Sequence, residues 1–154
     1  MSRRVTRENT VCARPPALFE AGTPPITQAA GLNAAIDWMR GLDWNAIGAH
    51  ERALTERLLD GLTGMDGITI AGPKGLQSRA PVVSFSHQRV HAHDICEILN
   101  RHHVAVRGGH HCAQPLLDAL DKPALTRVSL GAYATEADID ACLTGLDDAI
   151  RSLG

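Results

Sequence analysis

Residues 104–115 read VAVRGGHHCAQP, an apolar run that leads through two glycines into two histidines and a cysteine. The valines predict a strand over 104–106, and paired glycines favour a tight turn after it. Such a turn presents Cys112 beside cationic groups that favour a nucleophilic thiolate. We therefore interpret Cys112 as a reactive thiol, whereas Cys96 and Cys142, which fall on predicted helices, are interpreted as buried structural cysteines.

Helices and strands are predicted in alternation on both sides of this stretch, from the spacing of apolar residues. The predicted helices cover residues 94–102, residues around 116–120, and a C-terminal helix that Thr135 caps. The predicted strands cover residues 68–70, 81–86, 104–106 and 126–130, the first two as an antiparallel pair. This order of elements predicts an α+β fold, with helices packed on a small mixed sheet.

The N-terminal part of the chain has a different character. Residues 1–22 are expected to form an extended, irregular arm without a core of its own. Thr23 precedes two prolines and is expected to cap a helix that ends near residue 41, and a second helix follows over 43–64. We therefore divide the sequence into an arm, 1–22, and a domain, 23–154.

Composition excludes several classes of function. The chain has 154 residues, of which 44% are hydrophobic and 21% charged, with a formal net charge of −2. This balance provides no basic field for a nucleic acid, and no apolar run approaches the roughly 20 residues that a membrane span needs. The four cysteines match neither a zinc ribbon nor a dense disulfide framework. We expect a cytoplasmic protein with free thiols and neither nucleic acid nor membrane as a partner.

The histidines raise a metal site as an alternative. Seven of the eight lie between residues 87 and 111. No pair within a predicted helix has the i,i+4 spacing that places two ligands on one helix face, so we predict no metal site and keep a metal-binding domain as a weaker alternative. Arg107 and Arg127 lie at or near strands, where a guanidinium can bind a carboxylate through two hydrogen bonds or form a surface salt bridge.

Three motifs together resemble one family. FEAGTP at 19–24, VRGGHHCAQP at 106–115 and TRVS at 126–129 are similar to the C-terminal part of the SUF-type cysteine desulfurase/selenocysteine lyase family. These are pyridoxal phosphate enzymes of the class V aminotransferase fold, and the likeness covers essentially the whole chain. The resemblance implies that 23–154 is the small C-terminal domain, with its leading helices, of a fold-type I pyridoxal phosphate enzyme.

The resemblance also implies roles for single residues. Cys112 would accept the sulfur of L-cysteine as a persulfide, with release of alanine, for delivery to an acceptor protein in iron–sulfur cluster assembly. Arg127 would bind the substrate carboxylate, with Arg107 beside it. Loop support is expected from His110 and His111, and Thr23 would reach the cofactor phosphate of the partner subunit in a homodimer.

Two departures from the family pattern are present. Leu18 stands where many members carry an arginine. The only lysines are Lys74 and Lys122, and neither matches the family's Schiff-base lysine. The large cofactor-binding domain has no counterpart in these residues, so we expect activity to need a large-domain partner chain. The alternatives are a non-catalytic persulfide carrier or interaction module and an inactive truncated remnant.

Overall fold

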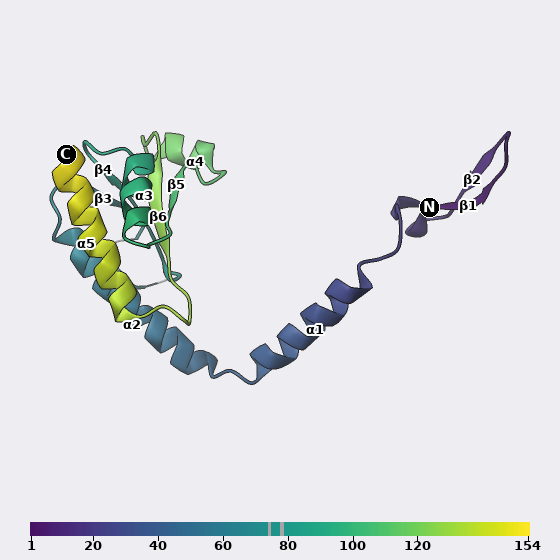
Figure 1. Cartoon of the computed structure of the whole chain (residues 1–154), viewed down its shortest axis with the longest axis horizontal. Helices are drawn as coiled ribbons and strands as arrows, with labels where there is room; N and C mark the ends of the chain where they lie inside the picture. The colour runs from purple at the N-terminus through teal and green to yellow at the C-terminus, as the bar shows by residue number, and fades with distance from the viewer. Residues whose placement is uncertain (74, 78) are drawn as a thin grey trace. The chain divides into compact units, whose positions relative to one another are not determined.

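The computed structural model describes residues 1–73, 75–77 and 79–154, so Lys74, expected in a turn, lies outside the described residues. The chain folds as two compact units, Met1–Asp43 and Trp44–Gly154 (Figure 1). No helix among the described residues is both long enough and apolar enough to cross a bilayer.

The N-terminal arm is more regular than expected. Strands β1 (Ser2–Val5) and β2 (Thr10–Cys12) pair antiparallel, and the short 3-10 helix η1 (Ala17–Phe19) follows. The hairpin turn is closed by Thr6, whose N–H donates to the Asn9 carbonyl at 2.8 Å and whose hydroxyl accepts from the Asn9 N–H at 3.0 Å. The prediction of an irregular arm is wrong because this side chain supplies local turn hydrogen bonds.

The first predicted helix is confirmed, but its expected cap is wrong. Helix α1 (Ile26–Arg40) begins with Pro25 at the N-cap position, and no side chain caps it. A capping side chain reaches the N–H groups two or three residues after its own position. With two prolines between it and Ile26, Thr23 stands too far upstream to reach them.

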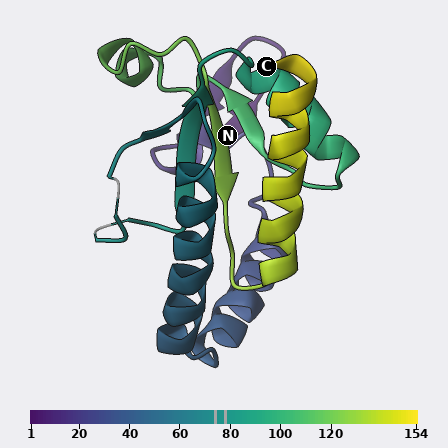
Figure 2. The ribbon, with the colours of Figure 1, turned by 90° about the vertical axis from the view of Figure 1, so that its left-hand side faces the viewer.

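The Trp44–Gly154 unit contains a four-stranded sheet in the order β3-β4-β6-β5. The strands are β3 (Ile68–Ala71), β4 (Val82–His87), β5 (Arg107–Gly109) and β6 (Leu125–Ser129). The helices are α2 (Trp44–Thr63), α3 (Ala92–Arg101), α4 (Gln114–Ala119) and α5 (Glu136–Leu153). Helices α2 and α5 stand in front of the sheet in Figure 2. One core joins residues of α2, α3 and α5 to Val83 and Phe85 of β4, so the α+β class is confirmed.

The sheet differs from the mixed sheet that was expected, because every neighbouring pair of strands is antiparallel. Strands β4 and β5 are both antiparallel to β6 and therefore run parallel to each other, with α3 connecting them. β6 inserts between them, so this β-α-β unit is split and its parallel strands share no hydrogen bonds.

The strand expected over 104–106 does not form there. The strand that pairs with β6 is β5, which begins three residues later, at Arg107. A Cβ atom at Gly108 would lie 2.9 Å from the Ala92 carbonyl oxygen and 2.8 Å from Cys96 Sγ. Only glycine lets β5 approach α3 this closely. Val104 and Val106 instead pack against the core from an unpaired segment.

Candidate active site

The loop after β5 holds Cys112 in an unusual backbone conformation. Gly109, His111 and Cys112 have φ angles of 120°, 56° and 57°. The left-handed region disfavours residues with a Cβ, by roughly 1–2 kcal/mol each, and such residues cluster at functional sites. The N–H of Ala113 donates to the His110 carbonyl at 2.9 Å and closes the turn. The result is an exposed thiol on a constrained loop.

Two arginines meet on the sheet face opposite the core. Arg107 and Arg127 are cross-strand partners in β5 and β6, and Ser84 of β4 is the next partner of Arg127. The Arg127 Nε atom is buried and has no hydrogen-bond partner among the described residues. Like charges directly opposite each other in a sheet are destabilising. The pair therefore suits an anion, which would reduce the repulsion between the two guanidinium groups.

Arg107 links this face to the cysteine. Its Nη2 atom lies 3.7 Å from Cys112 Sγ, within the range of a weak hydrogen bond to sulfur. A guanidinium is always protonated and has only donors, so it stabilises a thiolate in preference to a thiol. The sequence predicted cationic groups beside Cys112, and Arg107 lies in contact with its thiol.

His111 fastens the loop to β6. Its Nε2 atom lies 3.0 Å from the Leu125 carbonyl and must donate, because a carbonyl only accepts. Burial lowers the pKa of His111, and the Leu125 hydrogen bond, which raises it, is outweighed. Nearby Arg127 and Arg107 lower it further. The imidazole is therefore neutral at pH 7. His110 lies farther out, with Nδ1 at 3.5 Å from the Gln114 amide nitrogen.

An open cavity of about 400 Å³ surrounds the thiol. It is lined by the loop and its preceding strand from Arg107 to Cys112, by Pro123 and Ala124, and by His91 and His93. The two histidines come from the start of α3, and their rings meet edge to face at 5.0 Å. Sequence reasoning noted them only as metal candidates. Within the described part of the chain, no group of three or more His, Cys, Asp or Glu residues could hold a metal ion.

The two cysteines on helices do not line this cavity. Cys142 is 1% exposed, and burial raises its pKa to about 11. Burial also raises the pKa of Cys96, which is partly buried against Gly108. The interpretation of both as structural residues on helices agrees with this burial. Thr23 belongs to the Met1–Asp43 unit, where it is exposed.

Comparison with known proteins identifies the family of this chain. The sequence model of aminotransferase class-V matches residues 1–142. The chain belongs to this family. It is 44% identical over 149 residues to a probable cysteine desulfurase of Halobacterium salinarum, covering 97% of this chain and 36% of the relative. It is 43% identical to the cysteine desulfurase of Haloferax volcanii, and the match covers 97% of this chain and 35% of that relative.

Solved structures of cysteine desulfurases agree with the sequence match. The cysteine desulfurase CsdA from Escherichia coli superposes with a TM-score of 0.81 at 30% identity, over 100% of this chain and 38% of that protein. The cysteine desulfurase of Thermococcus onnurineus superposes with a TM-score of 0.80 at 32% identity, over 99% of this chain and 38% of that protein. The resemblance to part of a cysteine desulfurase is thus confirmed. The chain spans about a third of the length of the curated relatives it matches.

Proposed function

We propose that this chain carries the sulfur-accepting part of a cysteine desulfurase, with L-cysteine as the donor and Cys112 as the acceptor. The observation that carries the proposal is the exposed Cys112 thiol held 3.7 Å from the Arg107 guanidinium on a left-handed loop. A thiolate is the attacking form of cysteine, and a fixed cation beside it favours that form.

The proposed net step balances without an external oxidant or reductant. Cys112 Sγ bonds to the sulfur atom of L-cysteine, and the bond from that sulfur to the substrate Cβ breaks. One thiol proton passes to Cβ, so that alanine leaves and Cys112 retains a persulfide. Passage of the outer sulfur to the thiol of an acceptor protein, in iron–sulfur cluster assembly, would restore Cys112.

Arg127 is proposed to bind the carboxylate of the substrate. Its guanidinium lies on the same sheet face as Arg107, and its buried Nε needs a hydrogen-bond acceptor. A carboxylate accepts two parallel hydrogen bonds from a guanidinium fork, a geometry that lysine does not offer. His111, tied to the Leu125 carbonyl, is proposed as loop support, with His110 beside it.

The described residues do not by themselves fit pyridoxal phosphate, the cofactor that the family implies. Among them, no lysine lines the Cys112 cavity, and Lys122 lines a separate one. The cofactor's covalent anchor would therefore come from a large-domain chain, with Thr23 contributing to the phosphate site in an assembled dimer. The second candidate function is a persulfide carrier, in which Cys112 receives its sulfur from a complete desulfurase. The absence of a lysine from the described lining of the Cys112 cavity favours this candidate.

A sulfur-loading experiment tests the proposal. The chain is incubated with L-cysteine and pyridoxal phosphate, with and without the complete Haloferax volcanii enzyme, and mass mapping locates bound persulfide. We expect sulfur on Cys112 only when the complete enzyme is present, and none in the Cys112→Ser variant. Cys12→Ser, which removes another exposed thiol, is the matched control and should load normally.

The loading pattern has two adverse outcomes. Persulfide absent from Cys112 under both conditions would refute the sulfur-accepting role. Loading by the chain with L-cysteine and pyridoxal phosphate alone would refute the need for a large-domain partner.

A further inference from the structure

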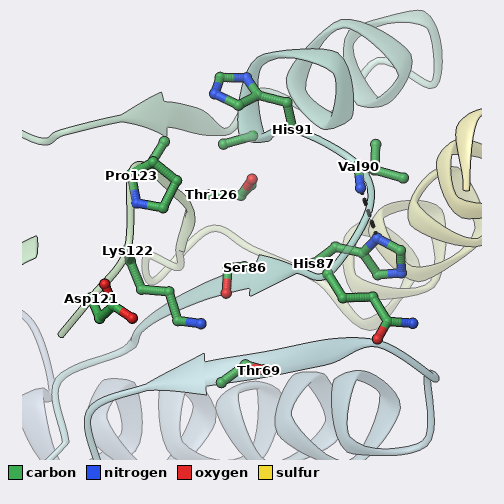
Figure 3. Close-up of a pocket in the computed structure, with 12 residues that line it drawn as sticks. Thr69, Ser86, His87, Val90, His91, Asp121, Lys122, Pro123 and Thr126 are labelled. Carbon is green, nitrogen blue, oxygen red and sulfur yellow. Dashed lines mark hydrogen bonds between the residues drawn. The ribbon is translucent and has the colours of Figure 1, made fainter.

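A second cavity of about 250 Å³ lies at one end of the sheet, where the loop between β4 and α3 meets the loop between α4 and β6 (Figure 3). We name it the sheet-end pocket. Its lining residues are Thr69, Ser86, His87, Gln88, Val90, His91, Ala92, Asp121, Lys122, Pro123, Ala124 and Thr126. It shares His91, Pro123 and Ala124 with the Cys112 cavity and does not include Cys112.

The sheet-end pocket contains one carboxylate and one ammonium group. Asp121 and Lys122 are neighbours in sequence, yet neither side chain forms an ion pair or hydrogen bond with any residue in the described ranges. The backbone explains their placement, because Asp121 has a φ of 51° and the N–H of Lys122 donates to the Leu117 carbonyl at 3.0 Å. This ends α4 and places both residues in the lining of the pocket, and Figure 3 shows the Lys122 chain extending toward Ser86.

Hydroxyl groups line the rest of the pocket. Thr69 and Ser86 face each other across β3 and β4. Thr126 is fully buried, and its Oγ1 atom has no hydrogen-bond partner among the described residues. Thr126 pairs with Phe85, so its side chain points to the core face, opposite to Thr69 and Ser86, and its hydroxyl is not part of the ligand site. The pocket thus combines two opposite charges with uncharged donors and acceptors.

We propose that the sheet-end pocket binds a small zwitterion, of the class of free α-amino acids. The ligand carboxylate would bind Lys122, its ammonium would bind Asp121, and the Thr69 and Ser86 hydroxyls, which share one face of the sheet, would complete its hydrogen bonds. Matching both charges leaves neither desolvated without a partner, which a simple anion or cation would not achieve. The volume is below the range for drug-sized ligands and suits a molecule of this size. The site does not depend on sulfur chemistry at Cys112.

The test is an NMR titration of the full chain with L-alanine. We expect saturable shifts of the backbone amides of Ser86, Asp121 and Lys122, which line the sheet-end pocket and not the Cys112 cavity, with roughly millimolar affinity. Acetate and ethylammonium each carry one of the two charges and should bind at least about ten-fold more weakly. Absence of saturable shifts in this loop, or acetate binding as tightly as alanine, would overturn the proposal.

Variants localise the site. Lys122→Met keeps the apolar stem, and Asp121→Asn keeps a residue that tolerates the left-handed region. Each should weaken alanine binding at least about ten-fold, since each removes a charge-assisted hydrogen bond. Asp118→Asn, a neighbouring exposed position on α4, is the matched control and should bind normally. Cys112→Ser should also bind normally, so this result is independent of the sulfur-loading experiment. Unchanged affinity in both pocket variants would refute the proposed ligand contacts.

Discussion

Replacement of Gly108 by alanine tests how β5 is held against α3. The added Cβ would lie 2.8 Å from Cys96 Sγ and 2.9 Å from the Ala92 carbonyl oxygen. The cysteine side chain is able to move, whereas a helix carbonyl is not, so β5 must shift. Overpacking of this kind destabilises by about 1–3 kcal/mol. For a chain of this length that lowers Tm by about 2–4 °C for each kcal/mol.

Urea and thermal unfolding measure the effect, and Gly48→Ala is the matched control. Gly48 lies inside α2 with nothing within 4 Å of an added Cβ, so alanine there should stabilise by about 0.5–1 kcal/mol. The two substitutions should therefore change the free energy of unfolding in opposite directions. Cys96→Ala added to Gly108→Ala should recover only part of the loss, because the Ala92 carbonyl remains. A Gly108→Ala protein as stable as the wild type would refute the close approach.

Three further predictions concern single side chains. At pH 7 a limiting alkylating reagent should label Cys112 well ahead of Cys142, whose burial raises its pKa to about 11; mass mapping gives the order, and equal rates would contradict the exposed-loop geometry. The hydrogen bond from His102 lowers the pKa of Asp148, so its stabilisation is present above about pH 4 and is lost as pH falls through the lowered pKa. The Tm difference between wild type and Asp148→Asn should therefore shrink on acidification, and a constant difference would argue against this pairing. Thr135→Ala removes the capping box of α5 and should reduce the free energy of unfolding by about 0.5–2 kcal/mol in urea titrations, whereas no change would show that the cap is dispensable.

Local patterns were enough for most elements of the fold. The apolar stripe of Leu54, Leu58 and Leu62 predicted α2, and all three side chains are buried. Thr135 caps α5 as predicted, because a capping box is formed by residues three positions apart. Helical and strand periodicity is likewise a property of near neighbours, so element type is readable without knowing the fold.

The position of β5 shows where local reasoning failed. The valines at 104–106 have the stronger strand propensity, yet pairing begins at Arg107 because Gly108 can lie against α3. Propensity describes one residue, whereas pairing depends on what lies beside and behind the strand. Residue type therefore indicated that a strand was near, and packing decided its register.

The sequence by itself determined the family motifs and the α+β class, and it predicted a reactive cysteine after paired glycines. Only the tertiary structure decided that β6 separates β4 from β5, and this places Arg127 opposite Arg107. It also decided that His91 of the α3 N-terminus lines the Cys112 cavity. These neighbours are far apart in sequence, and their meeting depends on strand order and on the burial of one shared core. No pattern within a single segment encodes which segments become adjacent, because that outcome is a property of the whole packed chain.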